Sequence, residues 1–292
     1  INEITASFHV GSKKLFREGA NEYQKLSDHI GKYPVVLVAP DDTNLVTEGS
    51  EARRRFFDSI LSQIDRNYLE SLIQYNQVLK QRNSLLKMFA DNHQFDQLAL
   101  ETYNVMLSGL GTSVFEKRRE FIATFAPVFR RFYNYIVSGE EAEVIYNTEL
   151  TSMNFSDGLK QSQSRDLVLQ RTTFGIHRDD YQFILGAGDL KRLGSQGQRK
   201  SFIIALKLAQ FDIIQRHKGF KPLLLLDDIF DKLDDFRIQK LLELIKNGEL
   251  GQLFITDARP DRTVALLKKI GMIASVFNVS DGTVHKYGQE KL

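Results

Sequence analysis

Residues 221–228 read KPLLLLDD, an apolar run that ends in two adjacent carboxylates. A short continuous apolar run predicts a strand that is covered on both faces, as in a parallel sheet flanked by helices. Asp227 and Asp228 then stand at the carboxyl end of the strand, where α/β sheets bind ligands. Two neighbouring carboxylates repel each other unless a cation compensates their charge. The sequence therefore predicts a divalent-cation site at Asp227 and a water activated by Asp228, with helix capping by both aspartates as the structural alternative.

A second motif precedes this strand. Residues 193–200 read LGSQGQRK, and helical spacing of apolar side chains begins directly after them at Phe202. Small residues let the backbone approach an anion closely, and the start of a helix directs N–H groups and a positive dipole end toward it. Ser195 would add a hydroxyl donor. Taken alone, such a loop is most often only a helix cap.

Strands and helices alternate on both sides of these motifs. Short apolar or alternating runs predict strands at residues 3–10, 34–38, 144–150, 181–185, 253–256, 274–279 and 283–287, and helical spacing predicts helices at 202–213, 236–245 and 262–270. Residues 50–138 carry helical spacing throughout and predict an insertion of two long antiparallel helices. The whole pattern predicts an α/β protein with a mixed sheet and three parts: 1–49, the all-helical insertion 50–138, and 139–292.

Length and composition exclude several classes of protein. The chain has 292 residues, of which 42% are hydrophobic and 26% charged, as in an ordinary globular protein rather than a disordered one. No apolar run approaches the roughly 18 residues that a membrane-spanning helix needs. Without cysteine, neither a disulfide nor a thiolate metal site can form, and a reducing compartment such as the cytoplasm is expected. Because the net charge is only +2, any nucleic-acid binding must rest on a local basic patch.

The two motifs together resemble the signature motif and the Walker B strand of ABC-type ATPases, in the order in which that class carries them. Residues 231–234, DKLD, follow where the class has its D-loop, and residues 254–257, FITD, where it has its switch. Residues 195–198 read SQGQ, where transporters have SGGQ, and this form is similar to the RecF family of bacterial recombination-repair ATPases, which is related to SMC proteins. Further family-like runs are PDD at 40–42, RRRFFD at 53–58, QRNSLLK at 81–87 and GIHRDD at 175–180.

The resemblance implies the fold of an ABC-type ATPase head with a helical arm, and a weak ATPase that uses ATP and Mg²⁺ in recombinational and gap repair. It implies an ATP-dependent homodimer in which each nucleotide lies between one subunit's Walker motifs and the partner's signature motif. The residues that it assigns to nucleotide are Ser195, Gln196, Gly197, Gln198, Asp234 and Asp257, with Asp228 catalytic and Asp227 the metal ligand. It also implies duplex or gapped DNA and single-stranded ends as ligands, and RecO and RecR as partners in loading recombinase.

Two groups of basic residues are candidates for contacts with DNA phosphates. One group surrounds the signature motif and the other opens the helical insertion: Lys191, Arg192, Arg199 and Lys200, and Arg53, Arg54 and Arg55. A repair protein that accepts any sequence is expected to contact the DNA backbone rather than to read bases. The alternatives are that residues 53–55 brace the arm through carboxylates and that the first group serves ATP.

The phosphate-binding P-loop, Gly-x-x-x-x-Gly-Lys followed by Ser or Thr, does not occur in the 292 residues. The family carries it near its N-terminus, so the chain is expected to lack that lobe and, by itself, to bind ATP poorly or not at all. Two other functions remain open: the nucleotide-binding subunit of an ABC transporter, and a DNA-binding scaffold that does not hydrolyse ATP. The long helical insertion argues against the first, and the intact Asp227, Asp228 and Asp234 argue against the second.

Overall fold

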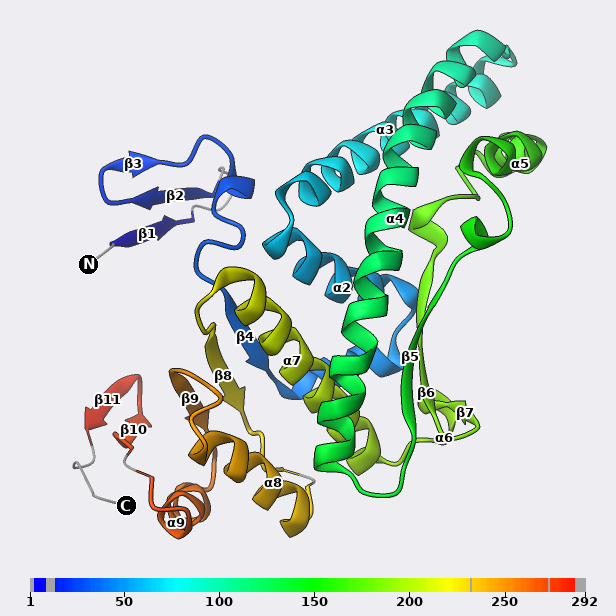
Figure 1. Cartoon of the computed structure of the whole chain (residues 1–292). Coiled ribbons are helices and arrows are strands. Elements are labelled where there is room, and N and C mark those ends of the chain that lie inside the picture. Colours follow the sequence, from blue (N-terminus) through cyan, green and yellow to red (C-terminus); the bar gives the residue numbers. More distant parts are fainter. Residues whose placement is uncertain (1–2, 9–13, 232, 273, 287–292) are drawn as a thin grey trace. The chain divides into compact units, whose positions relative to one another are not determined.

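A computed structural model describes residues 3–8, 14–231, 233–272 and 274–286 (Figure 1). The predicted α/β class with a long helical insertion is confirmed. Contacts between Cα atoms divide the chain into two compact units. The first comprises Ile1–Pro34, Arg53–Ile122 and Tyr146–Tyr181, and the second Val35–Ala52, Ala123–Ile145 and Gln182–Leu292. The three predicted parts, 1–49, 50–138 and 139–292, follow a different criterion and stay a prediction.

The first unit begins with a small antiparallel sheet. Its strands are β1 (Ile4–Ser7), β2 (Leu15–Glu18) and β3 (Asn21–Glu22), in that order. Ile4 pairs with Glu18 and Ser7 with Leu15. Residues 9–13, which include the end of the predicted first strand, lie outside the described residues.

The predicted insertion contains three helices: α2 (Ser50–Ile64), α3 (Arg66–Asn92) and α4 (Gln97–Ile136). α4 continues through Pro127 as a single helix and passes into the second unit. Asp65 caps α3 by accepting a hydrogen bond from the N–H of Tyr68 at 3.0 Å, and His93 ends the helix in a left-handed conformation, with φ +51°. Near this turn, α3 and α4 share an apolar cluster: Leu86, Phe89 and Leu100.

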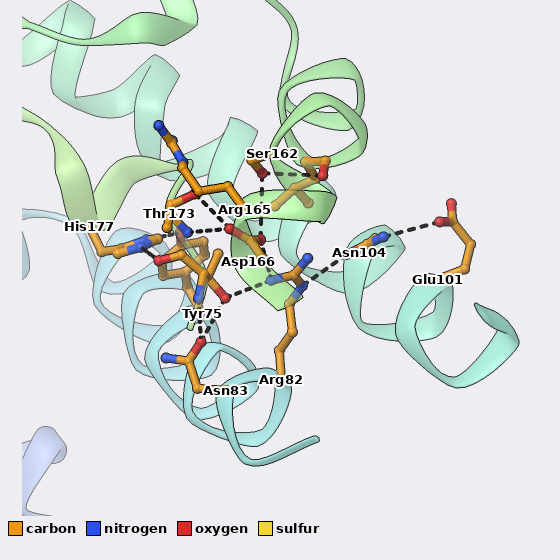
Figure 2. A network of polar contacts seen from close by, with 12 residues as sticks. Tyr75, Arg82, Asn83, Glu101, Asn104, Ser162, Arg165, Asp166, Thr173 and His177 are labelled. Atoms are coloured by element: carbon orange, nitrogen blue, oxygen red, sulfur yellow. Dashed lines mark hydrogen bonds and ion pairs between the residues drawn. The ribbon is translucent and has the colours of Figure 1, made fainter. Parts of the chain in front are cut away.

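A buried polar network in the first unit joins α3 and α4 to α5 (Phe155–Leu169) (Figure 2). The fully buried Arg82 donates from Nη1 to Oδ2 of Asp166 at 2.8 Å and from Nε to Oδ1 of Asn104 at 2.9 Å. Asp166 is also fully buried, and its Oδ1 accepts from the N–H and the hydroxyl of Thr173 at 2.9 and 2.6 Å. Hydrogen bonds on both sides thus keep this buried ion pair in one geometry.

The second unit is built on a parallel sheet. Its strands are β4 (Val35–Val38), β8 (Leu223–Asp227) and β9 (Leu253–Thr256), in the order β4-β8-β9. The helix α7 (Gln196–Lys218) packs against β4, and residues 201–211 of this helix are all buried. A helix that is buried on every side belongs to the centre of a domain. The central strand β8 contributes Leu224 and Leu226 to this core, whereas Leu223 is 38% exposed.

The two faces of this sheet differ in burial. Val36, Val38, Leu224 and Leu226 alternate with residues of the opposite face and are buried. On that opposite face, Val35 is 40% exposed, Leu37 46% and Phe254 51%. The prediction that residues 34–38 form a strand covered on both faces is therefore wrong for the described residues. The helix α7, which contacts β4, covers the buried face.

The remaining elements complete the two units. β5 (Ala142–Asn147), β6 (Asp180–Leu185) and β7 (Gly188–Asp189) form a sheet in that order, and β5 and β6 run from one unit into the other. The shorter helices are η1 (Leu26–Asp28), η2 (Pro40–Thr43), α1 (Asn44–Thr47), η3 (Glu149–Thr151), η4 (Ile176–Arg178) and α6 (Leu190–Leu193). The C-terminal part contains α8 (Asp235–Lys246), α9 (Pro260–Lys269) and the hairpin of β10 (Phe277–Ser280) and β11 (Thr283–Lys286). Within the described residues, no helix combines the length and apolar character needed to cross a membrane.

Candidate functional site

The carboxyl end of β8 carries the two predicted acidic residues. Asp227 is exposed, and one of its carboxylate oxygens accepts a hydrogen bond from the hydroxyl of Thr256 on the neighbouring strand β9. Asp228 is half-buried and has a left-handed backbone, with φ +47°. Its N–H donates to the carbonyl of Thr256 at 3.1 Å. The structure thus brings both carboxylates to the sheet edge where a ligand is expected.

The signature motif forms the start of α7. Ser195 is the N-cap, and its Oγ accepts from the N–H of Gln198 at 3.2 Å while the side chain of Gln198 accepts from the N–H of Ser195 at 2.8 Å. This reciprocal pair is a capping box. Gln196 and Gly197 are the first two helical residues, so their N–H groups belong to the positive end of the helix. Any side chain on Gly194 would approach the carbonyl of Leu190 to 2.7 Å, so the preceding turn favours glycine.

Of the other two aspartates assigned to nucleotide, Asp234 stands at a helix start and Asp257 three residues before one, α9. Asp234 is the N-cap of α8 and accepts from the N–H of Arg237 at 2.9 Å. Asp257 accepts from the N–H of Arg259 at 2.8 Å and from the hydroxyl of Thr263 at 2.6 Å. Burial raises the pKa of Asp257, but these hydrogen bonds outweigh that effect and leave the pKa below its ordinary value. Both residues therefore have a structural task, and their contact with nucleotide stays a prediction.

Comparison with known proteins shows a set of close bacterial relatives. The DNA replication and repair protein RecF of Flavobacterium johnsoniae is 45% identical over 278 residues, which cover 95% of this chain and 77% of that protein. The chain belongs to the RecF family. The RecF of Phocaeicola vulgatus is 46% identical over 284 residues, covering 97% of this chain and 76% of that protein. No protein-family model matches the chain.

Solved structures agree with the family and with the predicted ATPase-head fold. A structure of the recombination mediator protein RecF with ATP has a TM-score of 0.85 and 27% identity, and covers 98% of this chain and 76% of that one. A structure of the Smc head domain of Pyrococcus furiosus has a TM-score of 0.52 and 15% identity, and covers 98% of this chain and 71% of that one. The second likeness concerns the fold alone. It places this RecF-family chain in the same fold group as SMC heads.

The basic residues near the signature motif divide into two kinds. Lys191 and Arg192 are exposed on α6. Arg199 donates to the carbonyl of Lys191 at 2.8 Å, and Lys200 donates from Nζ to the carbonyl of Asp228 at 2.9 Å. The latter two side chains thus have acceptors inside the chain, whereas Lys191 and Arg192 extend from a surface helix.

The basic residues at the start of the arm contact carboxylates and carbonyls of the first unit. Arg53 makes a two-point ion pair with Asp180, at 2.8 and 2.9 Å, and Arg54 donates to the carbonyl of Asp179. Arg55 is exposed on α2. These bonds favour the bracing alternative for Arg53 and Arg54, and their contact with DNA stays a prediction.

The first unit also contains a buried arginine that no sequence motif indicated. Arg118 is 2% exposed and donates to Asp58 at 2.9 Å and to Asp179 at 3.0 Å. Burial raises the pKa of Asp179, although Arg118 opposes this shift. The available signal was indirect, because Asp58 and Asp179 lie in two of the runs that resemble the RecF family, 53–58 and 175–180.

His177, in the second of these runs, is a half-buried bridge. Its Nδ1 lies 2.8 Å from the hydroxyl of Tyr75 and its Nε2 lies 3.1 Å from the carbonyl of Thr172 (Figure 2). Burial lowers the pKa of His177 to about 4, so the ring is neutral near pH 7. Nε2 must then carry the proton, because a carbonyl can only accept, and Nδ1 accepts from Tyr75.

Proposed function

We propose that this RecF-family chain is the ATP-dependent DNA-binding component of recombinational and gap repair, active as an ATP-driven homodimer. The observation that carries the proposal is the placement, in one compact unit, of the signature motif at the start of α7 and two aspartates at the end of β8. Its relatives are named DNA replication and repair proteins, and a solved relative is RecF with ATP. Family membership argues against a transporter subunit.

DNA-stimulated ATP hydrolysis by the full-length protein tests this function. We expect weak hydrolysis that rises when duplex or gapped DNA is added. A full-length protein that binds DNA but hydrolyses no ATP, with or without DNA, would instead favour the non-hydrolysing scaffold. RecO and RecR are the proposed partners in loading recombinase, and their binding to the ATP-bound dimer would be measured separately.

The residues at the sheet edge fit a magnesium nucleotide. The carboxylate of Asp227 and the hydroxyl of Thr256 are both hard oxygen donors, the kind that Mg²⁺ prefers. Among the described residues, no group of three or more acidic or histidine side chains could hold a metal, so the phosphates of ATP would supply other ligands. When bound, Mg²⁺ would neutralise charge on the transferred phosphoryl group. Asp228 would orient the attacking water and accept its proton.

The signature motif is proposed to contact the nucleotide of the partner subunit. Ser195→Arg places bulk and positive charge at the start of α7, where Ser195, Gln196, Gly197 and Gln198 would meet the γ-phosphate. We expect this variant to lose ATP-driven dimerisation while it keeps its fold and its nucleotide affinity. Sedimentation with and without ATP measures the dimer.

A second variant separates this effect from loss of the helix cap. Ser195→Asn keeps a good N-cap residue and adds neither charge nor great bulk. It should therefore keep the helix content of the wild type and show how much dimerisation depends on the hydroxyl itself. An unchanged ATP-dependent shift to dimer in Ser195→Arg would remove the signature motif from the interface.

DNA binding is proposed to rest on phosphate contacts from the exposed residues of α6. Removing the charges of Lys191 and Arg192 should reduce the slope of log affinity against log salt by about 0.9 for each lost contact on duplex DNA. Arg53→Ala should leave the slope unchanged, because Arg53 is already paired with Asp180. Arg55→Ala tests the exposed member of the second group.

The measurement is a salt titration of duplex binding by the full-length protein with a non-hydrolysable ATP analogue. A smaller salt slope in Arg53→Ala would instead indicate that the arm residues 53–55 contact DNA phosphates. If none of these substitutions changes the slope, the DNA-binding surface lies elsewhere.

A further inference from the structure

The backbone of Asp228 is in a conformation that needs support. A φ of +47° is uncommon for any residue but glycine, although Asp tolerates it better than most. Such conformations persist when surrounding contacts fix them, and they cluster at functional sites. The position also directs the Asp228 carboxylate, because the side chain of a left-handed residue leaves the strand in a different direction from that of an extended one.

Two hydrogen bonds fix the peptide groups of Asp228 on opposite sides. Its N–H donates to the carbonyl of Thr256 at 3.1 Å, which ties it to β9. Its carbonyl accepts from Nζ of Lys200 at 2.9 Å. The second bond is charge-assisted and partly buried, which makes it one of the stronger kinds of hydrogen bond in a protein.

The helix that carries Lys200 is itself held rigidly. Lys200 lies in the second turn of α7, and the residues that follow it, 201–211, are all buried. Lys207, seven residues further and so on the same face of the helix, pairs with Asp42 of η2 at 2.7 Å. The other oxygen of Asp42 accepts from the N–H of Ala39 at 2.8 Å. Two lysines on one face of α7 therefore reach the segments that follow β8 and β4.

From this arrangement we infer that Lys200 is a positioning residue: it fixes the left-handed backbone of Asp228 and links the signature motif to Asp228 within one subunit. The inference rests on the proposed function, because Asp228 has a catalytic task only if the protein hydrolyses ATP. Ser195 and Lys200 stand at the start of the same rigid helix. A shift of that helix when the partner's nucleotide meets Ser195 would move the Asp228 carbonyl through Lys200. The dimer would thereby complete the site in which water is activated.

Lys200→Met in the full-length protein tests the inference, because methionine keeps the apolar stem and removes the donor. We expect kcat for ATP hydrolysis to fall about tenfold or more, the loss of one charged hydrogen bond, while nucleotide affinity stays within about twofold. Hydrogen exchange of the amides at 228–231 should become faster without nucleotide. Lys200→Arg keeps a charged donor and should recover part of both effects.

The matched control is Lys246→Met, which removes an exposed lysine at the end of α8 and should change none of these quantities. Unchanged exchange and an unchanged kcat in Lys200→Met would overturn the inference. A lower salt slope for DNA with unchanged exchange would also overturn it and make Lys200 a DNA contact. If the proposed function itself is wrong, the results differ. The wild type would then hydrolyse no ATP, whereas Lys200→Met would still show faster hydrogen exchange of the amides at 228–231.

Discussion

Asp228→Asn in the full-length protein should keep ATP binding and lower turnover by at least ~100-fold, the lower end for loss of a general base. The amide cannot accept the proton of an attacking water, whereas it has nearly the size and shape of the carboxylate. Asn also tolerates a left-handed backbone as Asp does, so the φ of +47° and the bond from Lys200 should persist. Phosphate release and nucleotide affinity, measured on the same preparation, separate chemistry from binding.

A matched control for this substitution is Asp235→Asn, an exposed aspartate in the first turn of α8. It removes the same charge a few residues away and should leave turnover within about twofold, because an exposed carboxylate in the first turn of a helix acts on the helix dipole rather than on the reacting phosphate. Turnover of Asp228→Asn near the wild-type rate would remove Asp228 from the mechanism.

The main features of this site could be predicted from short-range patterns. Four leucines followed by two aspartates predict a strand with charge at its carboxyl end, and β8 ends at Asp227. A serine with glutamine three residues later predicts a helix cap, and Ser195 caps α7. Both patterns predict the structure correctly because each depends only on the conformation of the neighbouring backbone.

Long-range contacts could not be predicted in the same way. Nothing near Lys200 in the sequence indicates that its ammonium reaches the carbonyl of Asp228, because that contact depends on how α7 packs on the sheet. For the same reason, the sequence does not decide whether Arg53 contacts DNA phosphates or a carboxylate of the protein. The fold brings its side chain to Asp180. The open face of β4 and β8 also depends on which helices the unit contains.

The helical insertion shows the same limit. Apolar spacing predicts its helices, but an arginine in such a helix is expected to face solvent. Arg82 and Arg118 are buried instead, because acidic partners from distant segments meet them there, Asp166 in one case and Asp58 and Asp179 in the other. The energetic weight of these pairs can be measured directly in the first unit.

Asp166→Ala should lower the free energy of unfolding of the first unit by about 3–5 kcal/mol, the usual cost of breaking a buried ion pair. Arg82 and Asp166 are both fully buried, so the substitution leaves a guanidinium in the protein interior without its counter-charge. Within the described residues, Nη2 of Arg82 already lacks a hydrogen-bond partner. Urea unfolding of the chain, followed by circular dichroism, measures the change.

Two further variants make the cause specific. Arg66→Ala removes an arginine that pairs with Asp28 and Glu70 on the surface, and it should cost no more than about 1 kcal/mol. The double variant Arg82→Met with Asp166→Leu removes both charges and fills similar volume, so it should recover most of the loss. If Asp166→Ala costs no more than Arg66→Ala, the ion pair is open to water and does not hold α3 to α5. If instead the double variant is as unstable as Asp166→Ala, the hydrogen bonds to Asn104 and Thr173, rather than the charges, stabilise this part of the arm.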